Sequence, residues 1–139
     1  MDRNLRILLD ADALVALFYK NDSNHPRAQK IAREIQNKNI SFFTSNLSIC
    51  EAATVLSQIT SQEEACDFIK RMKSGIDILY ITQEFYEMGL DYFSSVKRKN
   101  TSAFDCINIA ILRSYQLSAI FSFDEVYKKE GFKRIGIDS

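Results

Sequence analysis

An apolar run that ends in two carboxylates, from Ile7 to Leu14, constrains the fold of this chain more than any other stretch. Three consecutive apolar residues precede Asp10, which suits a strand covered on both faces, and apolar residues then recur at helical spacing through Leu17 and Phe18. Asp10 is therefore predicted at a strand-to-helix junction. In an open α/β sheet, ligands bind beyond the carboxyl ends of the strands, so this junction is the first candidate for a functional site.

Short apolar segments alternate with helical patterns along the rest of the sequence. Strands are predicted at 5–10, 40–44, 76–81 and 119–122, with a final edge strand at 133–137. Helices are predicted at 13–20, 26–39, 45–59, 61–75, 83–96 and 102–115, with a short one after Asp124. This alternation predicts an α/β fold with three α/β/α layers and a central, mostly parallel sheet of about five strands. The length of 139 residues fits a single domain, 1–139.

The charge and hydropathy of the chain exclude some classes of protein. Lys plus Arg and Asp plus Glu both number 18, so net charge alone favours neither nucleic acid nor an acidic partner. No apolar run approaches the roughly 18 residues of a membrane span. The first residues, Met1 to Asn4, lack the basic-then-apolar order of a secretion signal. A cytoplasmic protein is expected.

The cysteines and the single histidine argue against zinc and against a histidine-dependent triad. Cys50, Cys66 and Cys106 are widely spaced and lie within apolar helical patterns, so they are predicted to be small core residues. His25 lies beside Pro26 at the start of a helix and is expected to have a surface role. A regular stripe on the helix at 83–96 is likewise predicted to pack in the core: Phe85, Met88, Gly89, Tyr92, Phe93 and Val96.

Four acidic residues stand out by their positions. Asp10 and Asp124 follow apolar strands, Asp105 opens a helix, and Glu51 interrupts an apolar helix. Each has a simpler explanation: Asp10 or Asp12 as a helix cap, Asp105 within a capping box, Asp124 at a helix N-terminus, and Glu51 on a polar stripe. A parallel sheet would nevertheless place Asp10 and Asp124 at one edge, where entering helices could add the other two.

Carboxylates gathered in one cleft repel one another unless they are protonated or bridged by cations. Carboxylate oxygens without His or Cys are hard ligands that suit Mg²⁺ or Mn²⁺ rather than zinc. Such ions bind phosphate oxygens, activate a water and stabilise the charge that develops at phosphorus. Hydrolysis of a phosphodiester is therefore the favoured chemistry, with one metal ion or two.

The chain resembles the PIN-domain ribonucleases, and in particular the small VapC-type toxins of prokaryotic toxin-antitoxin pairs. Four blocks, in order and spacing, carry the resemblance: LLDADALVALF (8–18), SNLSICEAATVL (45–56), TSAFDCINIAIL (101–112) and IFSFDEVY (120–127). It implies that Asp10, Glu51, Asp105 and Asp124 bind the metal. Ser122 matches a hydroxyl position that orients a ligand or water. Asp12 falls where the family often has Asn, Ser or Thr.

The resemblance also implies a five-stranded parallel sheet flanked by helices, dependence on Mg²⁺ or Mn²⁺, and cleavage of single-stranded or structured RNA. It implies frequent homodimers and a cognate antitoxin protein that covers the acidic cleft. For the RNA phosphates, the basic run Lys97, Arg98 and Lys99 just upstream of Asp105 is a candidate contact, with a solvated loop as the alternative. Weaker candidates are Lys20, Lys128 and Lys129.

Two other functions remain open from the sequence. The spacing of Asp10 and Asp12 suits a phosphatase with an aspartyl nucleophile and a second acid two residues later, although no Lys-containing phosphate motif follows. A binding module that keeps the fold without catalysis is the other alternative. The presence of all four acids favours the metal-dependent endoribonuclease.

Overall fold

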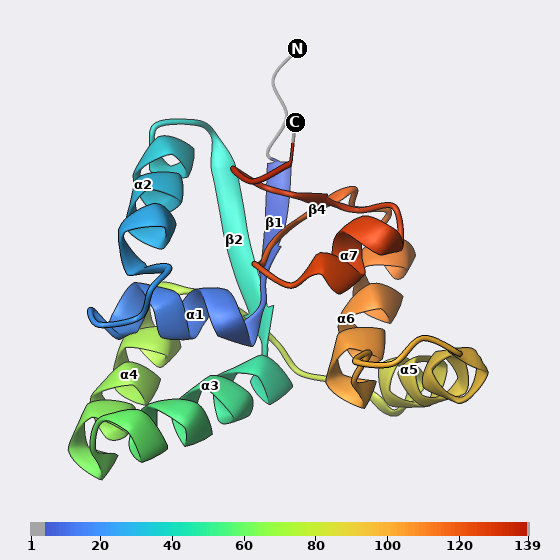
Figure 1. Cartoon of the computed structure of the whole chain (residues 1–139), viewed down its shortest axis with the longest axis horizontal. Helices are drawn as coiled ribbons and strands as arrows, with labels where there is room; N and C mark the ends of the chain where they lie inside the picture. Colours follow the sequence, from blue (N-terminus) through green and yellow to red (C-terminus); the bar gives the residue numbers. More distant parts are fainter. Residues whose placement is uncertain (1–4, 139) are drawn as a thin grey trace.

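In the computed structural model, which describes residues 5–138, five strands form one sheet in the order β3-β2-β1-β4-β5, and all neighbouring strands are parallel. Seven helices accompany these strands in the described chain (Figure 1). The strands are β1 Leu5–Leu9, β2 Ile40–Ser45, β3 Asp77–Leu79, β4 Ala119–Phe121 and β5 Lys133–Arg134. The helices are α1 Ala11–Phe18, α2 His25–Gln36, α3 Asn46–Ile59, α4 Gln62–Gly75, α5 Gln83–Ser95, α6 Ala103–Ser114 and α7 Glu125–Lys129. The predicted α/β class and parallel sheet are confirmed.

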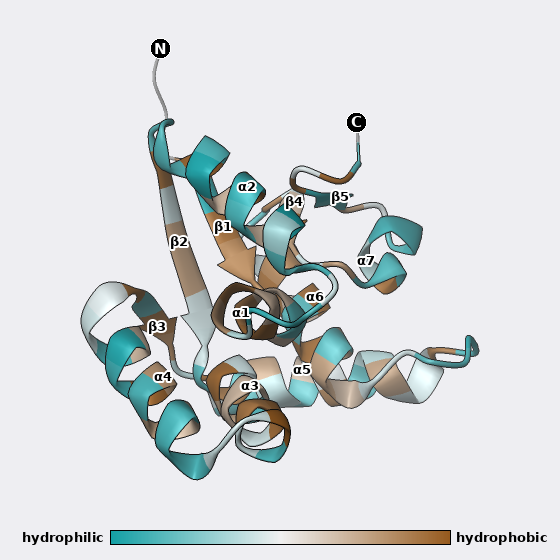
Figure 2. Ribbon diagram, turned by 60° about the vertical axis from the view of Figure 1, so that its left-hand side comes forward, coloured by the Kyte–Doolittle hydropathy of each residue, from teal (hydrophilic) through white to brown (hydrophobic). Residues whose placement is uncertain are grey.

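The helices cover the sheet on both faces, which explains the continuous apolar run in β1. Ile7 and Leu9 belong to a core shared with α1 to α4, whereas Leu8 belongs to a second core shared with α5, α6 and α7. Successive strand residues point to opposite faces, so both faces require apolar side chains. Figure 2 shows α1 as almost entirely hydrophobic, while α2 and α4 are largely hydrophilic on the outside.

Two strands pass into helices without an intervening loop, and both junctions lie at the same edge of the sheet. Asp10 alone separates β1 from α1, and β2 leads directly into α3 at Asn46. The Asp10 N–H donates to the Phe121 carbonyl at 3.0 Å, which continues the pairing of β1 with β4. The Thr44 hydroxyl donates to the Leu9 carbonyl at 2.8 Å. These contacts fix the position of Asp10 relative to the ends of β2 and β4.

Several sequence predictions about the helices are wrong in detail. Cys50 and Cys66 are exposed, and only Cys106 is buried. On α5, Met88 and Phe93 are 41% and 43% exposed, although the stripe was predicted to be core. The reason is the narrow contact of α5 with α6: a Cβ at Gly89 would lie 2.4 Å from Ile107 Cγ1. The two helices approach closely at one point, and the flanks of α5 remain in solvent.

The ends of the chain also differ from the prediction. Strand β5 is shorter than the predicted 133–137, and α1 begins two residues earlier than predicted. Met1 to Asn4, on which the prediction about secretion rests, lie outside the described residues. Within residues 5–138, no helix has both the length and the apolar character that crossing a bilayer requires.

Candidate active site

Ser122 connects three of the predicted acids at the carboxyl end of β4. Its hydroxyl lies 2.8 Å from Asp10 Oδ2 and 3.3 Å from Asp12 Oδ1, and it accepts the backbone N–H of Asp124 at 3.1 Å. A hydroxyl has one hydrogen, so it donates to Asp10 or Asp12 but not to both at once. The Phe123 N–H donates to Asp12 Oδ2 at 3.1 Å. The β4 end and the β1 end are thereby joined through acidic side chains.

Asn108 and Tyr127 connect Asp10 to the fourth acid. The Asn108 amide donates to Asp10 Oδ1 at 3.1 Å and to the Tyr127 hydroxyl at 3.0 Å. The Tyr127 hydroxyl in turn lies 3.3 Å from Asp105 Oδ1, to which it donates. Asn108 and Tyr127 are 3% and 0% exposed. A continuous chain of polar contacts therefore runs from Asp12 through Ser122, Asp10, Asn108 and Tyr127 to Asp105.

The simpler roles considered for these acids are also present. Asp10 caps α1, with Oδ1 accepting the Ala11 N–H at 2.8 Å, and Asp124 caps α7 by accepting the Val126 N–H at 2.9 Å. Asp105 and Ser102 form a complete capping box, with both hydrogen bonds at 3.0 Å. Capping does not compete with clustering here, because three helices begin at the same edge of the sheet. Each cap places its carboxylate among the others.

Glu51 lies at the margin of this group. Its side chain is half-buried and makes no hydrogen bond with any described residue, but it lines a small hollow of about 190 Å³ together with Asp12. Burial raises its pKa, and the negative charge of Asp105 raises it further. Glu51 is therefore close enough to Asp105 for the two charges to interact. No hydrogen bond to a described residue holds its side chain in place.

No positively charged side chain pairs with Asp10, Asp12 or Asp105 among the described residues, and the pKa values of all three are raised. Burial, the charge of Asp12 and the charge of Asp105 raise the pKa of Asp10 well above its usual range, against the hydrogen bond from Ser122. Burial raises the pKa of Asp12 to about 6, and the charge of Asp124 adds to the effect. The pKa of Asp105 is raised by burial and by the charge of Asp124. The acids therefore destabilise one another at neutral pH unless a cation binds.

The basic run between α5 and α6 has a divided role. Arg98, one of the three predicted phosphate contacts, donates to Glu130, which also accepts from Arg113 at 2.8 Å and from the Tyr92 hydroxyl. This Glu130 cluster attaches the 96–101 loop to α5, α6 and α7. Arg98 and Lys99 also line a hollow of about 310 Å³ that includes Asp124 and Lys129. Lys97 is exposed and is not among the residues that line this hollow.

A divalent cation fits this site by donor chemistry. The acids offer carboxylate oxygens without histidine or thiolate, which is the donor set that Mg²⁺ and Mn²⁺ prefer. Within residues 5–138, no three such side chains already converge closely enough to hold a metal together. Binding a cation would therefore require some of these carboxylates to move closer together.

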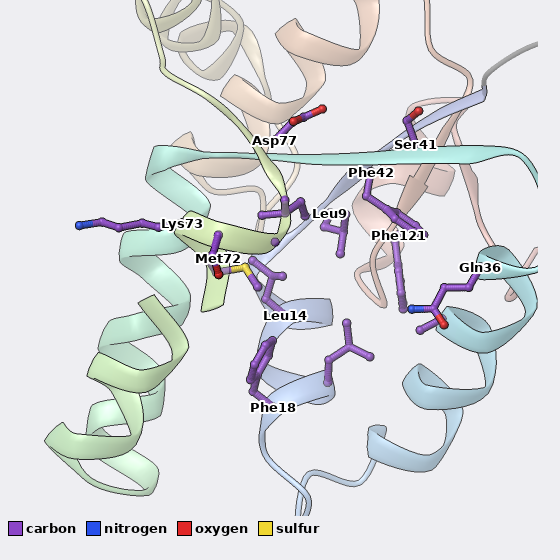
Figure 3. A pocket seen from close by; sticks show the side chains of 15 residues that line it. Leu9, Leu14, Phe18, Gln36, Ser41, Phe42, Met72, Lys73, Asp77 and Phe121 are labelled. Carbon is purple, nitrogen blue, oxygen red and sulfur yellow. The ribbon is translucent and has the colours of Figure 1, made fainter. Parts of the chain in front are cut away.

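A hollow of about 640 Å³, larger than the two hollows beside the acids, lies elsewhere, between α1, α2 and α4, and none of the acids discussed above lines it. Figure 3 shows that it is walled mainly by apolar side chains such as Leu9, Leu14 and Phe121, with Lys73 extending away from it. Its size does not make it the catalytic candidate, because it lacks convergent polar groups.

The sequence reasoning missed Asn108 and Tyr127. Each had a local signal: Asn108 is the one amide on the otherwise apolar face of α6, three residues after Asp105, and Tyr127 follows Asp124 by three residues. Residues three apart on a helix share a face, so both point toward the same edge as the acids.

Comparisons with known proteins agree with this architecture. The model of the PIN domain family matches residues 7–133. Mycobacterium tuberculosis VapC20, described as a toxin that cleaves the sarcin-ricin loop, superposes with a TM-score of 0.82 and 20% identity, over 91% of this chain and 95% of that one. No curated protein matches the sequence.

Two further solved structures share the fold. A chain of a toxin-antitoxin complex from Klebsiella pneumoniae has a TM-score of 0.62 and 16% identity, over 86% of this chain and 88% of its own. A chain of VapBC2 from Rickettsia felis, bound to promoter DNA, has a TM-score of 0.60 and 12% identity, over 94% and 97%. At these identities the structures bear on the fold alone, whereas the family model spans most of the sequence: the chain belongs to the PIN-domain family.

Proposed function

We propose that this protein is a metal-dependent endoribonuclease and the toxin of a toxin-antitoxin pair. The observation that carries the proposal is the chain of contacts from Asp12 to Asp105, in which one buried and two partly buried carboxylates are held by neutral donors only. Burying charge in this way is unfavourable for the empty protein. It becomes favourable when a cation and a phosphate are bound, which is the requirement of phosphodiester hydrolysis.

Mg²⁺ or Mn²⁺ would be held by Asp10, Glu51, Asp105 and Asp124. The bound ion would supply Lewis-acid activation of water and charge stabilisation at the scissile phosphate. Asp10 Oδ2 accepts only from Ser122, and Asp124 Oδ2 accepts from no described residue, so both oxygens have lone pairs for a ligand.

The neutral residues of the site position the acids. Ser122 and Asn108 hold the two oxygens of Asp10 from opposite sides, and Tyr127 holds Asp105. Asp12 is tied to the Phe123 N–H and to Ser122, so it supports the loop that carries Asp124. Asp12→Asn should therefore reduce activity less than Asp10→Asn, because an amide oxygen can still accept these donors.

The proposed substrate is RNA, with Lys97, Arg98 and Lys99 as the candidate phosphate contacts. Lys99 is the best placed of the three, since it shares a hollow with Asp124 while Arg98 is bound to Glu130. An antitoxin protein and a second copy of the chain are the proposed partners. The similarity to chains from toxin-antitoxin complexes supports the first of these partners.

The phosphatase alternative is disfavoured by the position of Asp10. Attack on phosphorus needs a carboxylate oxygen exposed to the substrate, but Asp10 is 6% exposed, whereas a small cation would need only one lone pair of Oδ2. No specific observation favours a non-catalytic binding module.

Cleavage of RNA by the purified protein tests the proposal. Activity should require Mg²⁺ or Mn²⁺ and should disappear with EDTA and in Asp10→Asn. Asp67→Asn is a matched control, because Asp67 is an exposed acid on α4 that pairs with Arg71. Metal-independent cleavage, or full activity in both Asp10→Asn and Asp105→Asn, would contradict the proposal.

A further inference from the structure

A neutral, mainly apolar hollow of about 500 Å³ lies between the first half of α5 and the start of α6. It is lined by Tyr86 and Leu90 of α5, by Phe104 of α6 and by Asn46 at the start of α3, among others. None of the residues that line it is charged. In Figure 1, α5 lies beside the end of α6 that faces the carboxyl edge of the sheet.

The hollow adjoins the acidic site through the first turn of α6. Phe104 lines it and is followed directly by Asp105. Thr101, on the other side of the same helix start, lines the charged hollow that contains Lys99 and Asp124. Phe104 and Asp105 are neighbours in the first turn of α6, with Cα atoms about 3.8 Å apart, so the hollow and the acidic site share this turn.

Two flat rings beside this hollow are unusually accessible. Tyr86 and Phe104 are 51% and 46% exposed. Unpaired RNA bases bind proteins by stacking on exposed aromatic rings and by hydrogen bonds along their edges. Asn46 could provide such a bond: its Oδ1 accepts the Ile81 N–H at 2.9 Å, while its NH₂ donates to no described residue.

We propose that this hollow binds an unpaired nucleobase of the RNA, that of a nucleotide next to the cleaved bond, while the phosphates lie on the Lys99 side of α6. The inference rests on the proposed ribonuclease function. It adds the feature of the RNA that the protein would recognise, an unpaired base next to the cleaved bond. An uncharged lining excludes a phosphate from the hollow and suits a base. Continuity with Asp105 through Phe104 distinguishes it from the other apolar surfaces.

The first test replaces the aromatic ring of Phe104. Affinity for a labelled single-stranded RNA is measured without metal, and kcat/KM is measured with Mn²⁺. Phe104→Ala and Phe104→Leu should both lower affinity about tenfold, and Phe104→Trp should restore it, because stacking needs a π-face rather than apolar volume. Phe93→Ala is the control: Phe93 is a similarly exposed phenylalanine, 43% against 46% for Phe104, but it lies on α5 and does not line the hollow.

The second test removes the base. RNAs with an abasic ribose at each position near the cut are compared on wild type and on Phe104→Ala. One abasic position should cost wild type about tenfold and cost Phe104→Ala nothing further, since ring and base act as one contact. Equal losses for both proteins at every position would overturn the inference.

A third measurement separates this inference from its competitor and from the function itself. If sedimentation shows that Tyr86→Ala and Phe104→Ala convert a dimer to a monomer while RNA affinity is unchanged, the hollow is a subunit interface and the inference is wrong. If wild type cleaves no RNA with any metal, the ribonuclease proposal fails, while a base-dependent loss of RNA affinity in Phe104→Ala would still uphold the subsite.

Discussion

Two buried carboxylates in this molecule, Glu130 and Asp10, have opposite surroundings. The Glu130 side chain is 7% exposed and accepts from two arginines and a tyrosine hydroxyl. Burial alone would raise its pKa, but the hydrogen bonds from Tyr92 and Arg98 and the charges of Arg98 and Arg113 lower it. Asp10 is 6% exposed, accepts only from neutral groups, and has acids as its charged neighbours, so its pKa is raised.

We interpret this difference as separating a carboxylate that stabilises the fold, Glu130, from one that is available to a ligand, Asp10. A buried acid with cationic partners forms a closed unit, because its charge is already balanced. A buried acid without them is balanced only by a proton or by an added cation, and such groups concentrate at functional sites. The following experiments test this comparison, beginning with the largest expected effect.

The largest difference between the acidic site and the Glu130 cluster is expected in the rate of RNA cleavage. Asp105→Asn should lower kcat about a thousandfold or more, because the amide loses a metal-ligating charge while its oxygen can still accept the Ser102 N–H of the capping box. Glu130→Gln should leave kcat within about threefold and raise KM, since only the basic loop is loosened. Steady-state cleavage of one RNA by both variants, with circular dichroism to verify folding, makes the comparison. Equal losses of kcat would refute it.

The free energy of unfolding should instead depend more on the Glu130 cluster than on the acidic site. Glu130→Gln should lower the free energy of unfolding by about 2 kcal/mol, because both arginines lose their carboxylate. The loss is limited because Arg98 and Arg113 are 39% and 49% exposed and water can solvate them. Urea unfolding with an unchanged m-value measures it. Asp67→Asn, which breaks an exposed pair with Arg71, should cost less than about 0.5 kcal/mol.

The fold was predictable because it follows from local patterns. An apolar run such as Ile7 to Leu9 specifies a doubly covered strand, and strands that alternate with helices specify a parallel sheet. Periodicity does not say how wide a helix contact is. The stripe on α5 contains Gly89, which brings the helices together at one point and leaves Met88 and Phe93 outside.

The acids were predictable for the same local reason: each ends a strand or begins or interrupts a helix. Their polar connections were not, because Asn108 meets Asp10 and Ser122 meets Asp10 across separations of 98 and 112 residues. The contact of Arg98 with Glu130, 32 residues away, was not predictable for the same reason. Sequence pattern identifies which acids share an edge, and tertiary contacts decide which basic groups remain available.

A smaller difference between variants of Asp10 and Glu130 is expected in the stabilisation that Mn²⁺ provides. At ten times its dissociation constant, Mn²⁺ should stabilise wild type and Glu130→Gln alike by about 1.4 kcal/mol. Asp10→Asn should lose most of this gain. Without metal it should be as stable as wild type or more stable, because one of the mutually repelling charges is removed. Thermal unfolding with and without Mn²⁺ measures both effects, and a strong loss of stability in metal-free Asp10→Asn and Asp105→Asn would favour capping as their only role.

The pH dependence of the metal-free protein gives the last predicted difference. Burial raises the pKa of Asp12 to about 6, so between pH 4 and 6 the folded protein binds a proton that the unfolded chain lacks, and stability falls as pH rises through that window. Asp138 has the opposite sign: hydrogen bonds from Arg134 lower its pKa to about 2, so its contribution is present above pH 4 and is lost as pH falls toward 2. These two groups together therefore contribute most to stability near pH 4.

Two matched amide variants resolve the two sides of this pH profile. Asp12→Asn should flatten the decline between pH 4 and 6, and Asp138→Asn should flatten the loss below pH 4, each measured by urea unfolding in the presence of EDTA. Mn²⁺ should remove the upper decline in wild type, because a bound cation favours the ionised carboxylates. A metal-free stability that increases from pH 4 to 6 would mean that Asp12 has a cationic partner in solution, and the acidic site would then resemble the Glu130 cluster instead of opposing it.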